Sequence, residues 1–532
     1  MTGDRFDVVV VGAGFAGMYT LHRLRELGFT AKAFEAASDV GGTWYWNRYP
    51  GARCDIESLD YSYSFDPELQ QEWEWSERYA TQPEILEYAN HVAERFDLRR
   101  DIQFDTRVTA AVWDEDSRRW TVATDRGDEA SAQHLVLAVG VLSHPKTPDI
   151  PGVETFAGPT YWTSRWPHEG VDFTGQRVGV IGTGSSAVQS IPLIAEQAEH
   201  LTVFQRTPAF SMPALNGPYD PGVVTERKAT YEEYRKEARY SRIGVVVPPT
   251  EELATAAGPE EREERFRQGW DEGTLYGIAR QYLDILIDPE SNEYASEFIR
   301  DRIRETVKDP KVAEALLPRT YPYATKRACL DTDYYETYNR DNVSLVNLRE
   351  TPIVEVDAGG IVTTDGRHDI DALVLAIGFD AQTGPLVAIN PVGVDGLELR
   401  DAWKDGPRNY LGLTTAGFPN MFMITGPGSP SVLTNMIVAI EQHVDWVTDC
   451  MAALRDRGAD RIEPTVEAQD GWVQHVAEVG EFTLYPRADS WYMGSNVPGK
   501  PRFFLPYVGG LDLYRTHCDH IAAQGYEGFT LT

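Results

Sequence analysis

The chain has 532 residues, which is enough for roughly three or four units of ordinary domain size. Its 49 Lys and Arg residues stand against 82 Asp and Glu residues, giving a net charge of −33 that disfavours nucleic acid and membrane surfaces as partners. Hydrophobic residues at 42% and charged residues at 25% are typical of packed globular domains and argue against a fibrous or tail-like protein.

The N-terminal region predicts a dinucleotide-binding unit. A β-branched run, 7–11, leads into a glycine turn and then into helical apolar spacing over 18–27. A second predicted strand, 30–35, ends in an acid placed to accept hydrogen bonds from an adenosine ribose. The alternative, a glycine-rich turn in an ordinary strand-helix unit, is disfavoured because strand, turn, helix and acid all occur in order. The residues assigned to this cofactor site are Gly12, Gly14, Gly17 and Glu35.

The same pattern returns in the middle of the chain. A predicted strand, 177–181, is followed by Gly182, Gly184 and Ser185, a helical stretch and another strand, 201–204. Here the second strand leads to Arg206. A guanidinium at this position suits a 2′-phosphate and not a bare ribose hydroxyl. The sequence therefore predicts FAD on the first unit and NADPH on the second. The alternative for Arg206 is a solvated surface cation.

The fold class that follows is α/β, with two Rossmann-like domains and a mostly helical insertion in the NADP domain. Two further apolar runs, 134–140 and 373–378, read as buried strands that carry the chain between the units, and 220–309 has helical spacing. The predicted domains are a discontinuous FAD domain, 1–142 and 386–532; an NADP domain, 150–215 and 333–380; and a helical insertion, 216–332.

Between the two glycine motifs lies a segment that resembles the FxGxxxHxxxWP fingerprint of type I Baeyer-Villiger monooxygenases. Its residues are Phe156, Gly158, Trp162, Trp166 and Pro167, with Trp162 standing where the fingerprint has histidine. Segments 41–51, 325–327, 426–428 and 491–499 resemble the same family, so the likeness runs from end to end. Phenylacetone and steroid monooxygenases are the most similar branches in their motifs.

The resemblance implies that NADPH reduces FAD, that O2 adds to the flavin, and that the resulting peroxide attacks a ketone to give an ester or lactone. Aryl, cyclic and steroid-like ketones are the implied substrates, with sulfoxidation as a side activity. The implied catalytic residues are Arg327, which supplies a permanent positive charge, and Asp55, which holds that guanidinium. Trp162 is expected to alter coupling or speed and to leave the chemistry in place, because indole lacks the titratable group of imidazole.

Further site residues follow from the same resemblance. Lys326 is expected to join Arg206 on the 2′-phosphate, and Trp491 to contact the nicotinamide nucleotide through its indole. A loop after residue 426 is expected to face the ketone. The remaining candidates are Gly42, Thr43, Trp44 and Asp55 for cofactor binding, and Ser431, Val432 and Leu433 for substrate binding.

Other readings remain open at this point. An N- or S-oxygenating flavin monooxygenase shares both glycine motifs, although such enzymes need no arginine of the Arg327 type. A flavoprotein that only senses or oxidises NADPH is a further alternative, whereas the lack of any CxxC pair argues against a disulfide reductase. We expect no metal site. The four cysteines form no disulfide pattern, so we expect a cytoplasmic location. We also expect a monomer or weak oligomer.

Overall fold

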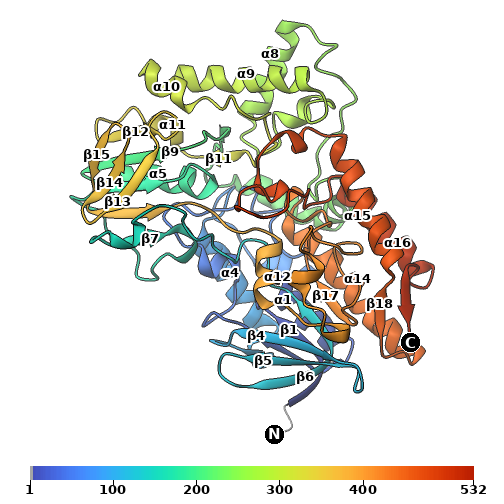
Figure 1. Cartoon of the computed structure of the whole chain (residues 1–532). Helices are drawn as coiled ribbons and strands as arrows, with labels where there is room; N and C mark the ends of the chain where they lie inside the picture. The colour runs from blue at the N-terminus through green and yellow to red at the C-terminus, as the bar shows by residue number, and fades with distance from the viewer. Residues whose placement is uncertain (1–3) are drawn as a thin grey trace.

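The computed structural model describes residues 4–532 and contains two separate, largely parallel sheets (Figure 1). The first sheet has the order β3-β2-β1-β6-β5-β4, with β17 added on β6. Strand β1 runs parallel to β2 and β6, whereas β5 runs antiparallel to β6 and β4. Its strands are β1 (Asp4–Val11), β2 (Ala31–Phe34), β3 (Ile102–Gln103), β4 (Val108–Asp114), β5 (Arg119–Thr124), β6 (Glu129–Leu137) and β17 (Met421–Met423).

The C-terminal part of the chain returns to this first sheet. Strand β17 pairs in parallel with β6, and helix α14 (Met436–Arg457) packs against α1 (Phe15–Glu26). Apolar side chains from both regions, such as Val10 and Ile440, belong to one buried cluster. Residues more than 400 positions apart thus share one core. The other helices of this part are α2 (Thr43–Trp46), α3 (Pro67–Glu72), α4 (Gln82–Arg95), α12 (Thr383–Ile389), α13 (Leu399–Ala402), α15 (Val466–Glu481) and α16 (Leu511–Ala523), with a short hairpin of β18 (Ile462–Pro464) and β19 (Phe529–Leu531).

The second sheet is parallel throughout and has the order β12-β9-β8-β16-β7. Its edge strand β7 contains part of the fingerprint segment. A three-stranded antiparallel sheet lies beside it in Figure 1. The elements are β7 (Thr160–Trp162), β8 (Arg177–Ile181), α5 (Ser185–Gln197), β9 (His200–Gln205), α11 (Tyr334–Thr337), β12 (Val343–Asn347), β13 (Ile353–Asp357), β14 (Gly360–Thr363), β15 (Gly366–Asp369) and β16 (Ala372–Leu375). The two predicted parallel sheets are therefore present.

The predicted helical stretch forms the third region, at the top of Figure 1. Most of its helices begin with proline, whose fixed φ suits the first helical position, and three are preceded by an aspartate that accepts backbone N–H groups. A short parallel pair, β10 (Ser211–Pro213) with β11 (Cys329–Asp331), closes this region at its base. The helices are α6 (Pro221–Ala229), α7 (Tyr231–Arg239), α8 (Pro259–Asp271), α9 (Pro289–Thr306) and α10 (Pro310–Leu316).

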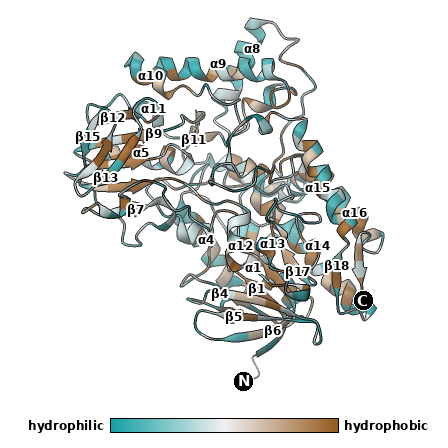
Figure 2. Cartoon of the chain, viewed as in Figure 1, coloured by the Kyte–Doolittle hydropathy of each residue, from teal (hydrophilic) through white to brown (hydrophobic). Residues whose placement is uncertain are grey.

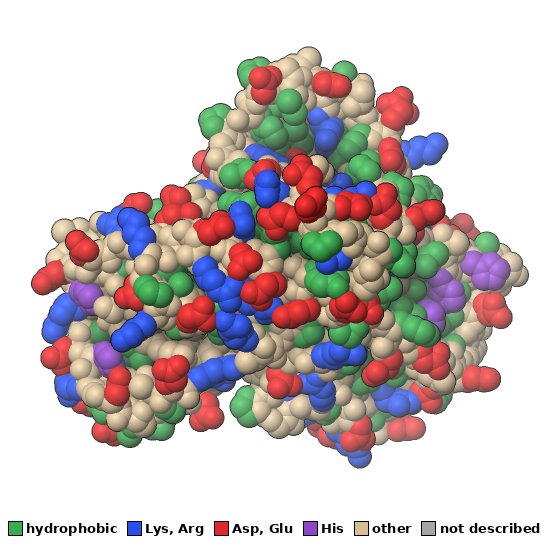
Figure 3. Space-filling model, turned by 90° about the horizontal axis from the view of Figure 1, so that it is seen from above, with side chains coloured by type: hydrophobic (Ala, Val, Ile, Leu, Met, Phe, Trp, Pro, Cys, Tyr) green, Lys and Arg blue, Asp and Glu red, His purple; other side chains and the backbone are tan. Residues whose placement is uncertain are grey.

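Hydropathy follows this arrangement. Figure 2 shows hydrophobic residues concentrated on the strands of both sheets, while α8 is mainly hydrophilic. In the view of Figure 3, acidic side chains are spread over the whole visible face with basic ones between them, which suits the net charge of −33. In residues 4–532, no helix is long and apolar enough to cross a membrane.

Several predicted element ends were wrong by a few residues. The first helix starts at Phe15, not at residue 18, because Gly14 already takes the N-cap position and Gly17 lies inside the helix. The strands predicted to reach residues 140 and 378 stop at Leu137 and Leu375. The glycines that follow, Gly140 and Gly378, have φ values of 70° and 78°, which a strand does not adopt.

Candidate active site

Arg327 and Asp55 form a paired contact between distant segments of the chain. Arg327 donates from Nε to Asp55 Oδ2 and from Nη2 to Asp55 Oδ1, both at 2.8 Å, so the pair is bidentate. The third nitrogen, Nη1, donates to the carbonyl oxygen of Val432 at 3.0 Å. Burial disfavours the charged guanidinium, yet the attraction of Asp55 outweighs it and raises the pKa of Arg327 above its usual range. The site thus holds a cation that stays charged at every working pH.

Tyr492 is a further partner of Arg327 that sequence reasoning missed. Its hydroxyl lies near the guanidinium, and its side chain is buried. Burial raises the pKa of Tyr492, while Arg327 opposes that shift. The ring lies 4.3 Å from that of Trp491, centroid to centroid. The only signal in the sequence was its place beside Trp491, which does not predict a contact with Arg327.

The first glycine turn has the close approaches that require glycine. A Cβ on Gly12, where φ is +102°, would lie 2.6 Å from the Ala138 carbonyl oxygen, and one on Gly17 would lie 1.9 Å from the oxygen of Gly12. A Cβ on Gly14 would likewise lie 3.2 Å from the Cα of Gly42. This turn leaves the N-terminus of α1 open for a pyrophosphate, so the residues fit a dinucleotide.

Glu35 lies at the end of β2 beside that turn. Its two oxygens accept backbone N–H groups from Ala13 and Ala37, each at 2.7 Å. Burial raises the pKa of Glu35, and these hydrogen bonds oppose the shift. Thr43 and Trp44 start the short helix α2 directly after Gly42, which itself lies against Gly14 of the glycine turn.

The second glycine turn is built in the same way. A Cβ on Gly182, where φ is +118°, would lie 2.3 Å from the Ala376 carbonyl oxygen. Gly184 is the N-cap of α5 and has open space where a side chain would point. Ser185 begins the helix, with its Oγ 3.4 Å from Cys329 Sγ.

Four cations gather beyond the second turn. Burial lowers the pKa of Lys326, and the neighbouring Arg206 and Arg349 lower it further. Lys146 has its pKa lowered by burial and by Arg206 in the same way. Arg349 also donates from Nε to the carbonyl oxygen of Arg206 at 2.9 Å. The structure thus brings together the two predicted cations and adds Lys146 and Arg349, an arrangement that a bound phosphate would stabilise.

The predicted substrate loop touches Arg327 directly through the carbonyl of Val432. Residues Ser431–Leu433 form one 3-10 turn, in which Ser431 and Val432 are buried and Leu433 is half-buried. The backbone at Ser431 has φ +43°, a left-handed conformation that costs free energy for a residue with a side chain. The tight turn aims the Val432 carbonyl at the guanidinium.

The fingerprint residues pack on the second sheet. A Cβ on Gly158 would lie 2.4 Å from the Asp371 carbonyl oxygen, and the Phe156 ring fills the space beside it. Trp162 ends β7, opposite Leu375 of β16, and Trp166, which precedes Pro167, is buried against Tyr161. Within residues 4–532, no hydrogen bond joins a fingerprint side chain to Arg327 or Asp55, so Trp162 does not contact this pair through a polar group.

The cysteines and His443 lie buried in the core of the protein. The four cysteines are free and buried, and burial raises the pKa of the Cys329 thiol to about 12. His443 is fully buried, accepts the Thr425 N–H at Nδ1 over 3.0 Å, and has its pKa lowered by burial to about 3. The described residues contain no cluster of side chains able to hold a metal ion.

Comparisons with known proteins agree with this arrangement. The sequence model of a family described as "Pyridine nucleotide-disulphide oxidoreductase" matches residues 9–219. A "Baeyer-Villiger monooxygenase" of Pseudooceanicola batsensis is 44% identical over 527 residues, covering 98% of this chain and 96% of the relative. "Phenazine N-monooxygenase PhzNO1" of Lysobacter antibioticus is also 44% identical, over 99% of this chain and 97% of its own. The solved structure "Oxidized steroid monooxygenase bound to NADP" is 54% identical, with a TM-score of 0.95 over 99% of both chains.

Proposed function

Since the chain belongs to the family of Baeyer-Villiger monooxygenases, flavoproteins that bind FAD and NADP(H), we propose that it inserts one oxygen atom of O2 beside the carbonyl carbon of a ketone. The product is an ester, or a lactone where the ketone is cyclic. The observation that carries this proposal is the bidentate pair of Arg327 and Asp55, held against the loop 431–433.

The proposal includes an assignment of residue ranges to domains. Residues 1–142 and 386–532 form the FAD domain, because they supply the first sheet and its glycine turn. Residues 150–215 and 333–380 form the NADP domain around the second sheet, and 216–332 form the helical insertion. FAD supplies the oxygen-activating and electron-accepting centre, and NADPH supplies the electrons.

Arg327 and Asp55 are the catalytic residues of the proposal. Negative charge develops on oxygen during the reaction, and a guanidinium stabilises it without any risk of losing its proton. Asp55 fixes the guanidinium in one orientation through two hydrogen bonds. The Val432 carbonyl accepts a hydrogen bond from the remaining edge of Arg327, and Tyr492 lies beside it.

The cation cluster sets the choice of nicotinamide cofactor. Arg206 and Lys326 bind the 2′-phosphate of NADPH, with Lys146 and Arg349 beside them. Trp491 contacts the nicotinamide nucleotide, and the next residue, Tyr492, lies beside Arg327.

The ketone is aryl, cyclic or steroid-like and lies against Ser431, Val432 and Leu433, with sulfides oxidised as a side activity. We also propose that the protein works in the cytoplasm as a monomer or weak oligomer, because its four buried thiols suit a reducing compartment.

N-oxygenation is a second candidate, favoured by the likeness to a phenazine N-monooxygenase. Attack on an aromatic nitrogen requires an electrophilic oxygen and gains nothing from a cation that stabilises negative charge. The Arg327–Asp55 pair therefore favours the ketone reaction.

The test is a product balance on the FAD-loaded protein. NADPH and O2 are supplied with phenylacetone in one reaction and with phenazine in another, and ester, N-oxide, hydrogen peroxide and consumed NADPH are measured. We expect about one benzyl acetate for each NADPH and little peroxide. N-oxide without ester would favour the second candidate. Peroxide alone, repeated with cyclohexanone and a steroid ketone, would overturn the proposal and favour an NADPH oxidase or sensor.

A further inference from the structure

Helix α5 contacts the segment that carries Asp55. The Nε2 of Gln189 donates to the carbonyl oxygen of Arg53 at 3.1 Å, and its Oε1 accepts the Tyr49 hydroxyl at 2.9 Å. Gln189 lies on α5, between β8 and β9 of the second sheet, whereas Tyr49 and Arg53 belong to the part of the chain that carries the first sheet. One side chain therefore joins the two parts through both ends of its amide.

The backbone of the two parts is in direct contact at the same place. A Cβ on Gly51, where φ is +81°, would lie 2.2 Å from the carbonyl oxygen of Gln189. Only a residue without a side chain fits so close an approach, and the positive φ favours glycine as well. The turn at residues 49–53 therefore packs directly on α5, within reach of the Gln189 amide.

The peptide unit between Arg53 and Cys54 is held from both sides. Its carbonyl oxygen accepts from Gln189, and its N–H group, that of Cys54, donates to the carbonyl oxygen of Ala80 at 3.2 Å. Because a peptide unit is planar, two such hydrogen bonds fix its orientation. Asp55 follows Cys54 directly, so the plane of this unit sets the direction in which the Asp55 carboxylate points.

The other member of the ion pair lies near the same helix. Ser185, the first residue of α5, has its Oγ 3.4 Å from the Sγ of Cys329, which follows Arg327 by two positions. Gln189 lies about one helical turn further along. Helix α5 thus contacts both of the segments that carry Arg327 and Asp55. It begins at the second glycine turn, where the pyrophosphate of a dinucleotide would lie.

We propose that Gln189 is a positioning residue for Asp55. It holds the peptide unit of Arg53 and Cys54 and so directs the carboxylate onto the Arg327 guanidinium. This inference rests on the proposed ketone reaction, in which that guanidinium stabilises negative charge. A small displacement of a group that acts on the reacting atoms lowers the rate by up to about 10²-fold. Loss of the Gln189 amide should therefore slow ester formation and leave ketone affinity almost unchanged.

The first test compares Gln189→Met with Gln197→Met in the full FAD-loaded protein. Methionine is close to glutamine in length and lacks the amide, so Gln189→Met removes both hydrogen bonds. Gln197 lies about 12 Å further along the same helix, where its Oε1 accepts the Phe173 N–H at 3.2 Å.

We expect Gln189→Met to lower kcat for ester formation from phenylacetone about tenfold and to raise the hydrogen peroxide formed per NADPH. KM for phenylacetone and KM for NADPH should stay within about twofold. Gln197→Met should retain all of these values. A rise in KM for NADPH without a fall in kcat would overturn the inference, because Gln189 would then serve nucleotide binding.

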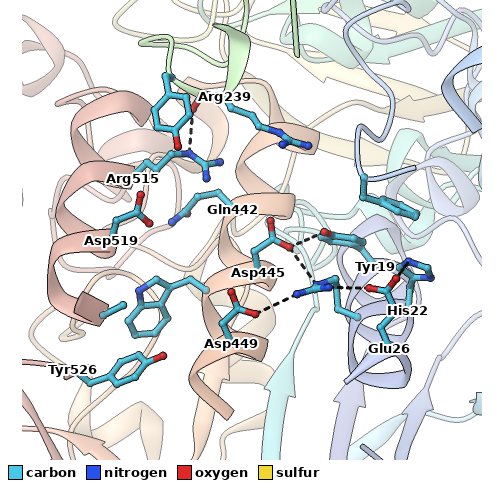
Figure 4. Close-up of a pocket in the computed structure, with 15 residues that line it drawn as sticks. Tyr19, His22, Glu26, Arg239, Gln442, Asp445, Asp449, Arg515, Asp519 and Tyr526 are labelled. Carbon is cyan, nitrogen blue, oxygen red and sulfur yellow. Dashed lines mark hydrogen bonds and ion pairs between the residues drawn. The ribbon is translucent and has the colours of Figure 1, made fainter. Parts of the chain in front are cut away.

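A second pair of variants separates the two hydrogen bonds of the amide. Tyr49→Phe removes the bond to Oε1 and leaves the bond to Arg53, so kcat should fall less than in Gln189→Met. An equal fall would refute a role for the Arg53 peptide unit. The matched control is Tyr19→Phe, since the Tyr19 hydroxyl donates to Asp445 at 2.6 Å in a cavity between α1, α14 and α16, outside the active site (Figure 4). Tyr19→Phe should leave kcat and peroxide formation unchanged.

The last test combines Gln189→Met with Asp55→Asn. If Gln189 acts through Asp55, its loss adds little once the carboxylate is gone, so kcat of the double variant should lie within about twofold of Asp55→Asn alone. Losses that multiply would show that Gln189 acts independently of Asp55 and would overturn the inference. Wild-type kcat and peroxide yield in Gln189→Met would also overturn it. Wild-type protein that forms no ester would instead refute the proposed function, and this inference with it.

Discussion

Asp55→Asn isolates what the carboxylate charge does for Arg327. Asparagine keeps the size of the side chain and one hydrogen-bond acceptor, but it loses the negative charge and the second acceptor. Asp55 provides two of the contacts of the guanidinium, both 2.8 Å long. After the substitution, Arg327 keeps only the Val432 carbonyl and Tyr492 as fixed neighbours on its other edge.

The size of the effect follows from burial. Losing one partner of a fully buried pair costs about 3–5 kcal/mol, but here the two side chains are 25% and 22% exposed, so water screens part of the charge. We expect the free energy of unfolding to fall by about 2 kcal/mol. Loss of one preorganised electrostatic contact lowers kcat about 10²–10³-fold, and we expect that range for ester formation.

Glu57→Gln is the matched control. Glu57 pairs with Arg78 at 2.6 Å, and these side chains are 22% and 24% exposed, almost the same as in the first pair. Both variants should lose similar stability in urea unfolding, but only Asp55→Asn should lose ester formation and produce more hydrogen peroxide per NADPH. If the two variants lowered kcat for phenylacetone by the same factor, the assignment of Asp55 to catalysis would be wrong.

Three further predictions follow from the same contacts. Tyr492→Phe removes the hydroxyl beside Arg327, and we expect kcat for the ketone to fall about tenfold while KM changes little, as steady-state rates would show; a change in KM alone would contradict this. Arg206→Ala and Lys326→Ala should each raise KM for NADPH at least tenfold and leave KM for NADH unchanged, so an equal loss with both nucleotides would exclude 2′-phosphate binding. Burial lowers the pKa of His443 from 6.5 to about 3 in the folded protein, so between these pH values only the unfolded chain takes up the proton. The folded protein therefore loses about 5 kcal/mol of stability as pH falls from 6.5 to about 3. His443→Gln should reduce the fall in Tm between pH 6.5 and 4, and an identical fall would show that His443 is not responsible.

The parts of the fold that local sequence patterns determine could be predicted. Each glycine turn needs residues without a side chain within a few positions of one another, so Gly12 and Gly182 identify both cofactor turns from the sequence alone. The helical stretch was equally clear, because Pro and Asp at helix starts are local signals. Strand ends were less certain, since hydrophobic runs continue past the last paired residue into the glycine turns.

The site contacts that were missed come from separate segments. Lys146 and Arg349 lie beside Arg206 only because the chain folds back between the two sheets, and neither belongs to a recognisable motif. Tyr492 was missed for the same reason.

Two consecutive residues connect the parts of the active site. Arg327 turns toward Asp55 and Val432, which belong to the part of the chain that carries the first sheet, whereas Lys326 turns toward Arg206 and Arg349 beside the second sheet. A single peptide unit therefore joins the position of the guanidinium to the occupancy of the phosphate site. We therefore expect binding of a phosphate at Lys326 to affect the alignment of Arg327. Trp162 ends the edge strand of that second sheet, so the predicted effect of Trp162 on coupling would have to pass through the sheet and not through a polar contact with Arg327.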